Sequence, residues 1–144
     1  MDKRILGIDF GSVRVGVAVS DPLRIIAQSV GTYSNDQKLL ERLTAVAQEY
    51  DVGLVVVGMP FTLRGEKGMK AREVDTFVER LKQNLGVDVV TWDERFTSRI
   101  AQQTLIQMGT TPKQRRTNKG RVDAMASALI LQSFLDQTKH SQGC

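Results

Sequence analysis

The sequence predicts an α/β domain built on a mixed five-stranded sheet, with helices packed on both of its faces. Three strand-like segments come first, close enough in sequence to pair as antiparallel neighbours. Strand and helix patterns then alternate along the rest of the chain, which is the order expected of parallel βα units. A chain of 144 residues, of which 41% are hydrophobic, is large enough to form one such core.

The strands are predicted from short apolar runs that end at glycine or polar residues. Residues 5–10 (ILGIDF) form a buried run that leads into a glycine turn. Residues 13–20 alternate, which places the odd-numbered valines from Val13 to Val19 on one face. Residues 53–57 (GLVVV) are apolar throughout, as expected for a strand at the centre of a covered sheet. The five predicted strands span residues 5–10, 13–20, 27–33, 53–57 and 87–92, the last also buried.

Apolar residues at helical spacing predict four helices. The first carries Leu39, Leu43 and Val46 on one stripe. Gly86 suits the C-terminal cap of the second helix, and Gly109 ends the third. Residues 58–68 are rich in glycine and predict a loop, and the polar residues after Asp136 are expected to fray. The four predicted helices span residues 36–50, 69–85, 97–108 and 122–135.

Domain organisation and location follow from what the sequence lacks. We expect one domain over residues 1–138 and a flexible tail over residues 139–144. Cys144 is the one cysteine, so an internal disulfide cannot form and a reducing compartment is expected. The first residues lack the apolar run of a signal peptide, and no stretch approaches the roughly 18 apolar residues that span a bilayer. We therefore expect a cytoplasmic protein without a membrane partner.

Three carboxylates lie on or beside apolar elements, where a charge is costly unless it is paired or binds a cation. Asp9 lies within the first strand, Glu94 follows the last strand, and Asp123 lies in the first turns of the last helix. Simpler roles are open for each of them. Asp9 can cap the hairpin turn, Glu94 can pair with Arg95, and Asp123 can favour the helix N-terminus. Asp93 points away from Glu94 in an extended strand, so only one of the two can readily face a shared site.

Taken together, the three acids predict a metal site. Gathered in one cleft, they would repel one another unless a divalent cation neutralised them. Mg²⁺ prefers such oxygen ligands, Mn²⁺ can replace it, and two such ions can clamp the attacking and leaving oxygens of a phosphodiester. His140 is the only histidine and lies in the polar tail, which excludes histidine-based nucleases, Ser-His-Asp hydrolases and histidine zinc sites. Metal-activated water is therefore the chemistry we expect.

Basic residues surround these acids in the sequence. Residues 113–121 (KQRRTNKGR) contain five cations and no acid, and they precede the helix of Asp123. With a net charge of +4 on the whole chain, this pattern favours a polyanion, although a solvated loop without a partner is the alternative interpretation. Aromatic residues make up only 6%, which favours backbone recognition over base stacking. The cations expected to bind nucleic acid are Arg64, Lys67, Lys113, Arg115, Arg116, Lys119 and Arg121.

Several blocks of the sequence resemble the YqgF-type proteins, a family described as Holliday junction resolvases and as nucleases that mature the small-subunit ribosomal RNA precursor. The blocks are DFGSVRVG from Asp9, GMP from Gly58, WDERFTS from Trp92 and DAMASALIL from Asp123. They occur in order and span nearly the whole chain, so the set is more specific than any one block.

The resemblance implies an RNase H-like fold and a magnesium site formed by Asp9, Glu94 and Asp123. It also implies that Arg14, Arg95 and Thr97 support this site or contact phosphate. Asp93 is a candidate for a supporting position behind the metal ligands. The implied substrate is structured nucleic acid, either precursor 16S ribosomal RNA cut at its 5′ end or a Holliday junction. Related resolvases of this fold use four acids rather than three, which leaves the choice of substrate open.

Two other functions fit parts of the sequence. The segment from Asp9 to Ser12 resembles the phosphate-binding hairpin of sugar kinases and actin-like ATPases, but those proteins bind nucleotide between two such domains and this chain supplies one. A non-catalytic ribosome-assembly factor would need only the basic residues, and it would tolerate alanine at Asp9 or Glu94. The oligomeric state depends on the substrate, because symmetric junction cleavage needs a homodimer whereas a monomer can trim RNA.

Overall fold

The computed structural model describes residues 3–59, 68–93 and 119–142, and the side chains of all of these except residues 119–124 and 139–142. Its strands are β1 (Arg4–Asp9), β2 (Arg14–Ser20), β3 (Ala27–Ser34), β4 (Val52–Met59) and β5 (Asp88–Asp93). Its helices are α1 (Leu39–Glu49), α2 (Met69–Leu85) and α5 (Lys119–Gln142). The strands form one sheet in the order β3-β2-β1-β4-β5. The first three strands pair antiparallel and β1, β4 and β5 are parallel, which confirms the predicted mixed sheet.

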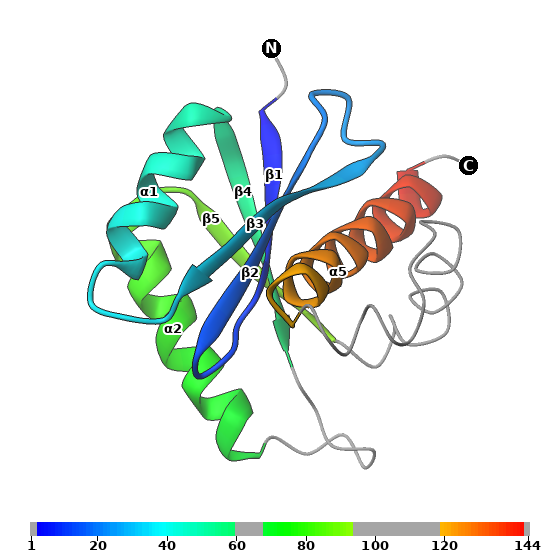
Figure 1. Ribbon diagram of the computed structural model, residues 1–144. Coiled ribbons are helices and arrows are strands. Elements are labelled where there is room, and N and C mark those ends of the chain that lie inside the picture. Colours follow the sequence, from blue (N-terminus) through cyan, green and yellow to red (C-terminus); the bar gives the residue numbers. More distant parts are fainter. Residues whose placement is uncertain (1–2, 60–67, 94–118, 143–144) are drawn as a thin grey trace.

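Helices cover both faces of the sheet, with α1 and α2 on one side and α5 across the other (Figure 1). Strand alternation divides the apolar residues between two cores. The larger core, under α1 and α2, includes Leu6, Ile8, Val15, Val17, Leu43, Val57, Met59 and Leu81. The smaller core, under α5, includes Ile5, Ala18, Val56, Ala128, Leu131 and Leu135. Because neighbouring residues of a strand point to opposite faces, these two sets give the face of each residue in β1, in β2 and in β4 from Leu54 onward, beyond the register shift at its start.

Most predicted elements are present, with differences at their ends. α1 begins at Leu39 rather than at residue 36, because Asp36 Oδ1 accepts a hydrogen bond from the Lys38 N–H at 2.9 Å and holds a turn there. β4 continues to Met59, so the predicted loop begins later than residue 58. α2 has the predicted span, and Gly86 ends it in the left-handed conformation, with φ of 67°.

α5 is longer than the helix predicted over residues 122–135. It begins at Lys119, so Lys119 and Arg121 belong to the helix rather than to the predicted basic loop. It also continues past Asp136 to Gln142, because polar side chains carry little helical penalty on the solvent side. The apolar stripe therefore predicted only the part that packs on the sheet. The helix predicted over residues 97–108 lies outside the described residues, and no described helix is long and apolar enough to cross a membrane.

Two predictions about the strands are wrong. The last predicted strand was expected to be buried, but β5 is at the edge of the sheet and the side chain of Val90 is 36% exposed. Val13 was expected to share a strand face with Val15, Val17 and Val19, but those three valines are buried and Val13 is 72% exposed. The reason is that β2 begins one residue later, so Val13 belongs to the hairpin turn.

Side-chain hydrogen bonds join α5 to the loop between β2 and β3. Gln132 Oε1 accepts a hydrogen bond from the Ala27 N–H at 2.9 Å, and Gln132 Nε2 donates to the Ile25 carbonyl at 3.0 Å. The same loop is ordered by Asp21 Oδ1, which accepts hydrogen bonds from the N–H groups of Ile25 and Ile26 at 2.7 and 2.9 Å. These bonds fix the middle of α5 against the loop at one end of the sheet.

Candidate active site

Asp9 is the last residue of β1, and strand alternation places it on the face that α5 covers. Ile5 packs in the core under α5. A Cβ built on Gly7 would lie only 2.7 Å from the Leu131 Cβ of that helix. Asp9 follows at the same alternate spacing, and its side chain is half-buried. The first predicted acid therefore lies on a helix-covered face at a strand end, which is where ligands collect in sheets of this kind.

Glycines flank Asp9 on both neighbouring strands. Gly16 of β2 is its register partner. Ile8 pairs with Val57, which places Gly58 of β4 on the other side of Asp9. By alternation both glycines face α5, so neither brings a side chain next to the carboxylate. Across β2, β1 and β4, the residues Gly16, Asp9 and Gly58 therefore lie side by side, with one carboxylate between two glycines. Glycine within a strand often marks close approach by a ligand or another backbone.

α5 runs antiparallel to β1 across this face (Figure 1). Its middle lies over Gly7, because the Leu131 Cβ is close to that glycine. The next residue, Gln132, bonds to Ala27, at the end of the sheet where β1 begins. The first turns of α5 therefore lie toward the other end of the sheet, where β1 finishes with Asp9.

Position 123 belongs to these first turns. It precedes Ser127 by four residues, and residues four apart lie on the same side of a helix. Ser127 is fully buried, and its carbonyl oxygen lies 3.2 Å from a Cβ built on Gly7, so this side of α5 faces β1. The helix backbone thus brings the position of the predicted acid Asp123 toward the end of the sheet that carries Asp9. The side chain of Asp123 lies outside the described part of the chain.

β5 ends at Asp93, directly before the predicted acid Glu94. Trp92 faces α5, where its ring meets that of Phe134 edge to face, with centroids 5.8 Å apart. Alternation then places Asp93 on the opposite face of the sheet from Asp9. Asp93 therefore does not share a face with the first acid, and Glu94 itself lies outside the described residues.

A tight hairpin turn after Asp9 brings Arg14 to the same end of the sheet. Gly11 is required in this turn, because a Cβ there would overlap the Arg14 carbonyl oxygen. Asn35 holds the turn from β3: its N–H donates to the Val13 carbonyl at 2.9 Å, and its Nδ2 donates to the Gly11 carbonyl at 2.8 Å. Arg14 is half-buried and begins β2, so its backbone lies at the end of the sheet where β1 finishes.

Two cavities adjoin this turn. The hairpin–α2 cavity has a volume of about 500 Å³ and is lined by Gly11, Ser12, Val13, Arg14, Met69, Lys70 and Glu73. The second cavity, of about 350 Å³, lies between α1 and α2 and includes the rings of Phe10 and Phe77, whose centroids are 4.6 Å apart. Glu73 lines both. No sequence pattern points to Met69 or Lys70, because only the fold brings the first turn of α2 to a hairpin more than fifty residues earlier.

The rest of the predicted site is not described by side-chain contacts. Among the described residues, no group of three or more His, Cys, Asp or Glu side chains is placed to hold a metal ion. Asp9 nevertheless fits one, because a half-buried carboxylate between two glycines in register offers an oxygen ligand. The predicted residues outside the described part are Arg64, Lys67, Glu94, Arg95, Thr97, Lys113, Arg115 and Arg116; Lys119, Arg121 and Asp123 are placed by the α5 backbone alone.

The sequence was compared with protein families and with known proteins, and both comparisons point to one family. Residues 3–137 match the model of the RuvX family, which is described as Holliday junction resolvase. The chain belongs to this family. A protein of Sulfurihydrogenibium sp. (strain YO3AOP1) is 38% identical over 141 residues, which cover 96% of this chain and 94% of that protein. A protein of Salinibacter ruber is 45% identical over 138 residues, 95% of both chains. Both relatives carry the name "Putative pre-16S rRNA nuclease", so the RuvX family member described here belongs among nucleases.

Solved resolvase structures share the fold. The structure described as T. thermophilus RuvC in complex with Holliday junction substrate aligns with a TM-score of 0.58 at 18% identity, over 94% of this chain and 96% of that one. The complex of Fowlpox virus resolvase with Holliday junction DNA aligns with a TM-score of 0.58 at 13% identity, over 94% and 98% of the two chains. At these identities the likeness concerns the fold alone, and it confirms the predicted RNase H-like class.

Proposed function

We propose that this RuvX family member is a magnesium-dependent nuclease that hydrolyses phosphodiester bonds in structured nucleic acid. The observation that carries the proposal is the setting of Asp9. It is a half-buried carboxylate at the end of β1, between Gly16 and Gly58, on the face where α5 brings position 123 to the same end of the sheet. Acids that converge from a strand and a helix are suited to a hard divalent cation.

The proposed ligands of Mg²⁺ are Asp9, Glu94 and Asp123. Strand alternation favours Glu94 over its neighbour, because Trp92 faces α5, Asp93 faces away, and the next residue in an extended chain returns to the α5 face. When bound there, Mg²⁺, or Mn²⁺ in its place, supplies charge stabilisation for phosphoryl oxygens and activated water. The carboxylates hold that charge in a fixed position at the strand ends.

Cations around the acids are proposed to hold the nucleic-acid backbone. Arg14, Arg95 and Thr97 would contact or orient the phosphate that is cut. The basic residues of the segment 113–121, together with Arg64 and Lys67, would attract the polyanion over a longer range. Binding that depends on such contacts weakens steeply as salt increases, because each phosphate contact releases counterions.

The proposed substrate is precursor 16S ribosomal RNA, cut near its 5′ end in the cytoplasm. The names of the relatives that cover nearly the whole chain support this choice. The family description supports a second candidate, the Holliday junction. The two candidates differ in what they need from the protein, because a monomer can trim RNA, whereas symmetric junction cleavage requires a homodimer.

The proposal is tested by offering the full chain both substrates. A labelled four-way DNA junction and a precursor 16S RNA fragment are incubated with Mg²⁺, with Mn²⁺ and with EDTA. We expect metal-dependent cleavage that falls by more than about 100-fold in Asp9→Asn, because a metal ligand is lost. The matched control is Asp88→Asn, an exposed acid at the opposite end of β5, which should cleave as the wild type does.

A second pair of variants tests the face of the sheet. Glu94→Gln is expected to abolish cleavage, and Asp93→Asn, one residue earlier on the other face, is expected to retain most of it. Equal binding without cleavage in every metal condition, in wild type and in Asp9→Asn alike, would reject the nuclease. That outcome would favour the non-catalytic assembly factor, for which charge reversal at Arg115 and Arg116 is the deleterious change.

A further inference from the structure

The loop between β2 and β3 exposes a cluster of large apolar side chains. Leu23 is 72% exposed, Ile25 is 43% exposed and Ile26 is 62% exposed. Three of the six large apolar side chains exposed in the described part of the chain therefore lie within four consecutive residues. These three side chains form the apolar tip of the loop. An exposed apolar patch rimmed by polar residues marks a surface that a partner covers.

Hydrogen bonds hold this loop in the conformation that exposes the apolar tip. Asp21 Oδ1 accepts hydrogen bonds from the Ile25 and Ile26 N–H groups at 2.7 and 2.9 Å. Gln132 Nε2, from α5, donates to the Ile25 carbonyl at 3.0 Å. Arg24 has a left-handed backbone conformation, with φ of 58°, which is costly for a residue other than glycine. The exposure of the apolar tip is thus built into the fold.

Charges of opposite sign lie on opposite sides of the apolar tip. Arg24 extends toward the start of β1, where its Nε donates to the Lys3 carbonyl at 2.8 Å. On the other side, Gln132 Nε2 donates to the Ile25 carbonyl and also to Asp136 Oδ1 at 3.1 Å, so that carboxylate lies beside the loop. Figure 1 shows the loop between the start of β1 and the C-terminal half of α5. Arg24, Lys3 and Asp136 are all exposed.

We propose that the apolar tip binds the apolar tip of a second copy of this chain across a two-fold axis. A two-fold rotation about an axis through the tip exchanges the two charged sides, so Arg24 of each copy meets Asp136 of the other. The apolar side chains form the centre of the contact and the charges form its rim, as in protein interfaces generally. This association goes beyond the proposed nuclease function and does not depend on it.

The distribution of charge favours a second copy over other occupants. An anionic surface, such as a lipid bilayer, would attract Arg24 and Lys3 but would be repelled by Asp136. A strand added to the neighbouring edge of the sheet is disfavoured, because the pairing of β3 with β2 shifts register beside Gly31, and such bulges protect an edge. A surface that carries both signs of charge around an apolar centre is complementary to itself.

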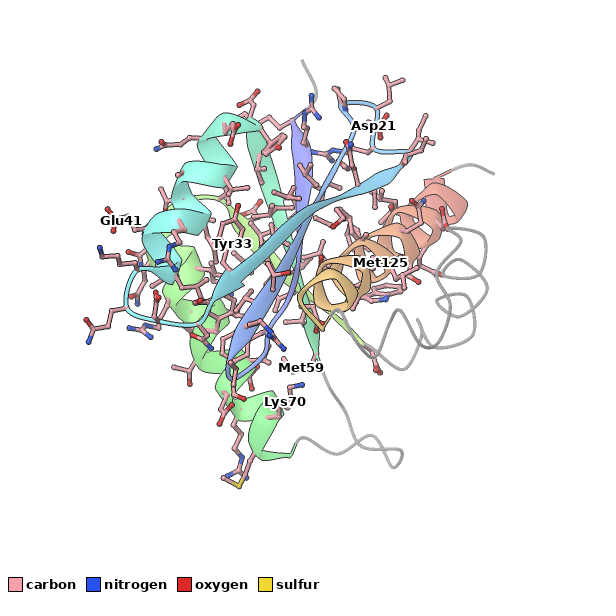
Figure 2. The ribbon with its side chains drawn as sticks, viewed as in Figure 1. Asp21, Tyr33, Glu41, Met59, Lys70 and Met125 are labelled. Atoms are coloured by element: carbon pink, nitrogen blue, oxygen red, sulfur yellow. The ribbon has the colours of Figure 1, made fainter. Side chains whose placement is uncertain are left out.

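The contact lies far from the proposed catalytic acid. The loop joins Ser20 to Ala27 at the end of the sheet where β1 begins, whereas Asp9 is the last residue of β1. Figure 2 shows Asp21, in this loop, at the end of the molecule opposite to Met59, which ends β4. β1 has six residues, so about 20 Å separates the contact from Asp9. Association through the apolar tip therefore leaves both sites open to substrate.

The apolar tip is tested by sedimentation velocity of the full chain, without nucleic acid or divalent metal. The patch is small beside the roughly 800 Å² per partner of a standard interface, so we expect a weak dimer, with Kd of about 10–100 μM. Leu23→Ser combined with Ile26→Ser should raise the Kd at least about tenfold. The matched control is Val13→Ser, which removes a side chain that is also 72% exposed but lies at the other end of the sheet. It should leave the Kd unchanged.

The charged rim is tested by reversing one sign at a time. Arg24→Glu and Asp136→Lys should each fail to dimerise at concentrations where the wild type does, because each variant places like charges across the axis. An equimolar mixture of the two variants should associate, since a mixed dimer has two attractive pairs. Circular dichroism and urea unfolding establish that each variant is folded, and association of the mixture confirms that each has kept the shape of the tip.

Three outcomes would contradict the proposal. A wild type that stays monomeric up to about 1 mM overturns it, as does a dimer that Leu23→Ser/Ile26→Ser and Val13→Ser affect equally. A mixture of folded Arg24→Glu and Asp136→Lys that remains monomeric overturns the two-fold arrangement. No substrate or metal is present in these measurements, so they remain informative if the cleavage test with Asp9→Asn fails.

Discussion

The two faces of the sheet are built differently. The face under α1 and α2 is filled by large, fully buried side chains such as Leu6, Ile8 and Leu43. The face under α5 instead presents small residues at the centre of the sheet, among them Gly7 and Ala18, which are paired in register. Large side chains keep a helix at a distance, whereas glycine allows the helix to approach the strand backbone closely.

This difference suggests separate tasks for the two faces. The face under α1 and α2 provides most of the apolar burial and therefore most of the stability. The face under α5 carries Asp9 between two glycines, and its small residues determine how close α5 comes. Changes on the first face should affect stability alone, and changes on the second should affect stability and cleavage together.

The largest effect on stability is expected from Leu43→Ala. Leu43 is fully buried in the larger core, so the truncation leaves a cavity and should lower the free energy of unfolding by about 2–5 kcal/mol. Cleavage by the protein that remains folded should be close to that of the wild type, because α1 packs on the face of the sheet opposite to Asp9. Urea unfolding gives the first quantity, and an assay at low temperature gives the second. A loss of cleavage larger than the unfolded fraction explains would end the division of tasks between the faces.

A smaller loss of stability, with a larger loss of cleavage, is expected from Gly7→Ala. The new Cβ would lie 2.7 Å from the Leu131 Cβ, which is not the end of a flexible side chain, so α5 must shift away from the sheet. Such overpacking costs about 1–3 kcal/mol. The shift also moves position 123 relative to Asp9, so cleavage should fall more than stability alone would predict.

The control for this change is Gly68→Ala. Gly68 precedes α2 and has φ of −85°, and among the described residues no atom lies within 4 Å of a Cβ built on it, so alanine should be accommodated there. The same assays apply to both variants. Wild-type cleavage by Gly7→Ala would mean that the distance between α5 and β1 does not control the site.

Much of the fold could be predicted from the sequence because its signals are local. The alternating valines of β2 and the apolar stripe of α1 each reflect burial on one side of a single element. The predictions that failed concern features that depend on the neighbouring strands and turns. Val13 continues the alternation of β2 but lies in the turn, and the edge position of β5 follows from strand order, which no single segment encodes.

The site was predictable in part. Asp9 could be singled out because a carboxylate inside an apolar run needs an explanation, and the structure places it at the end of β1; its role in the site stays a prediction. The glycines on either side of it, Gly16 and Gly58, were visible in the sequence, but their meaning depends on strand register. Met69 and Lys70 gave no signal, because their position opposite the hairpin is a property of the tertiary structure.

The smallest predicted effect concerns the contact between α5 and the β2–β3 loop, at the end of the sheet that is far from Asp9. There Gln132 bonds to the Ile25 carbonyl, and Asp21 Oδ1 accepts hydrogen bonds from the Ile25 and Ile26 N–H groups. These two backbone hydrogen bonds lower the pKa of the Asp21 carboxyl below its usual value, and the bond from Ile26 has the larger effect. The charged form is thus favoured in the folded protein, and the loop that anchors α5 depends on it.

Because the folded pKa of Asp21 is below the unfolded one, its contribution to stability is fully present above about pH 3.9 and is lost as the pH falls through the folded value. Asp21→Asn removes the charge and keeps a carbonyl acceptor. We expect it to lower the urea midpoint slightly at pH 7, and we expect the gap from the wild type to close between pH 4 and the folded pKa. Urea titrations at several pH values from 7 down to 3 measure this gap. If it stays constant to pH 3, the charge of Asp21 does not order the loop that Gln132 joins to α5.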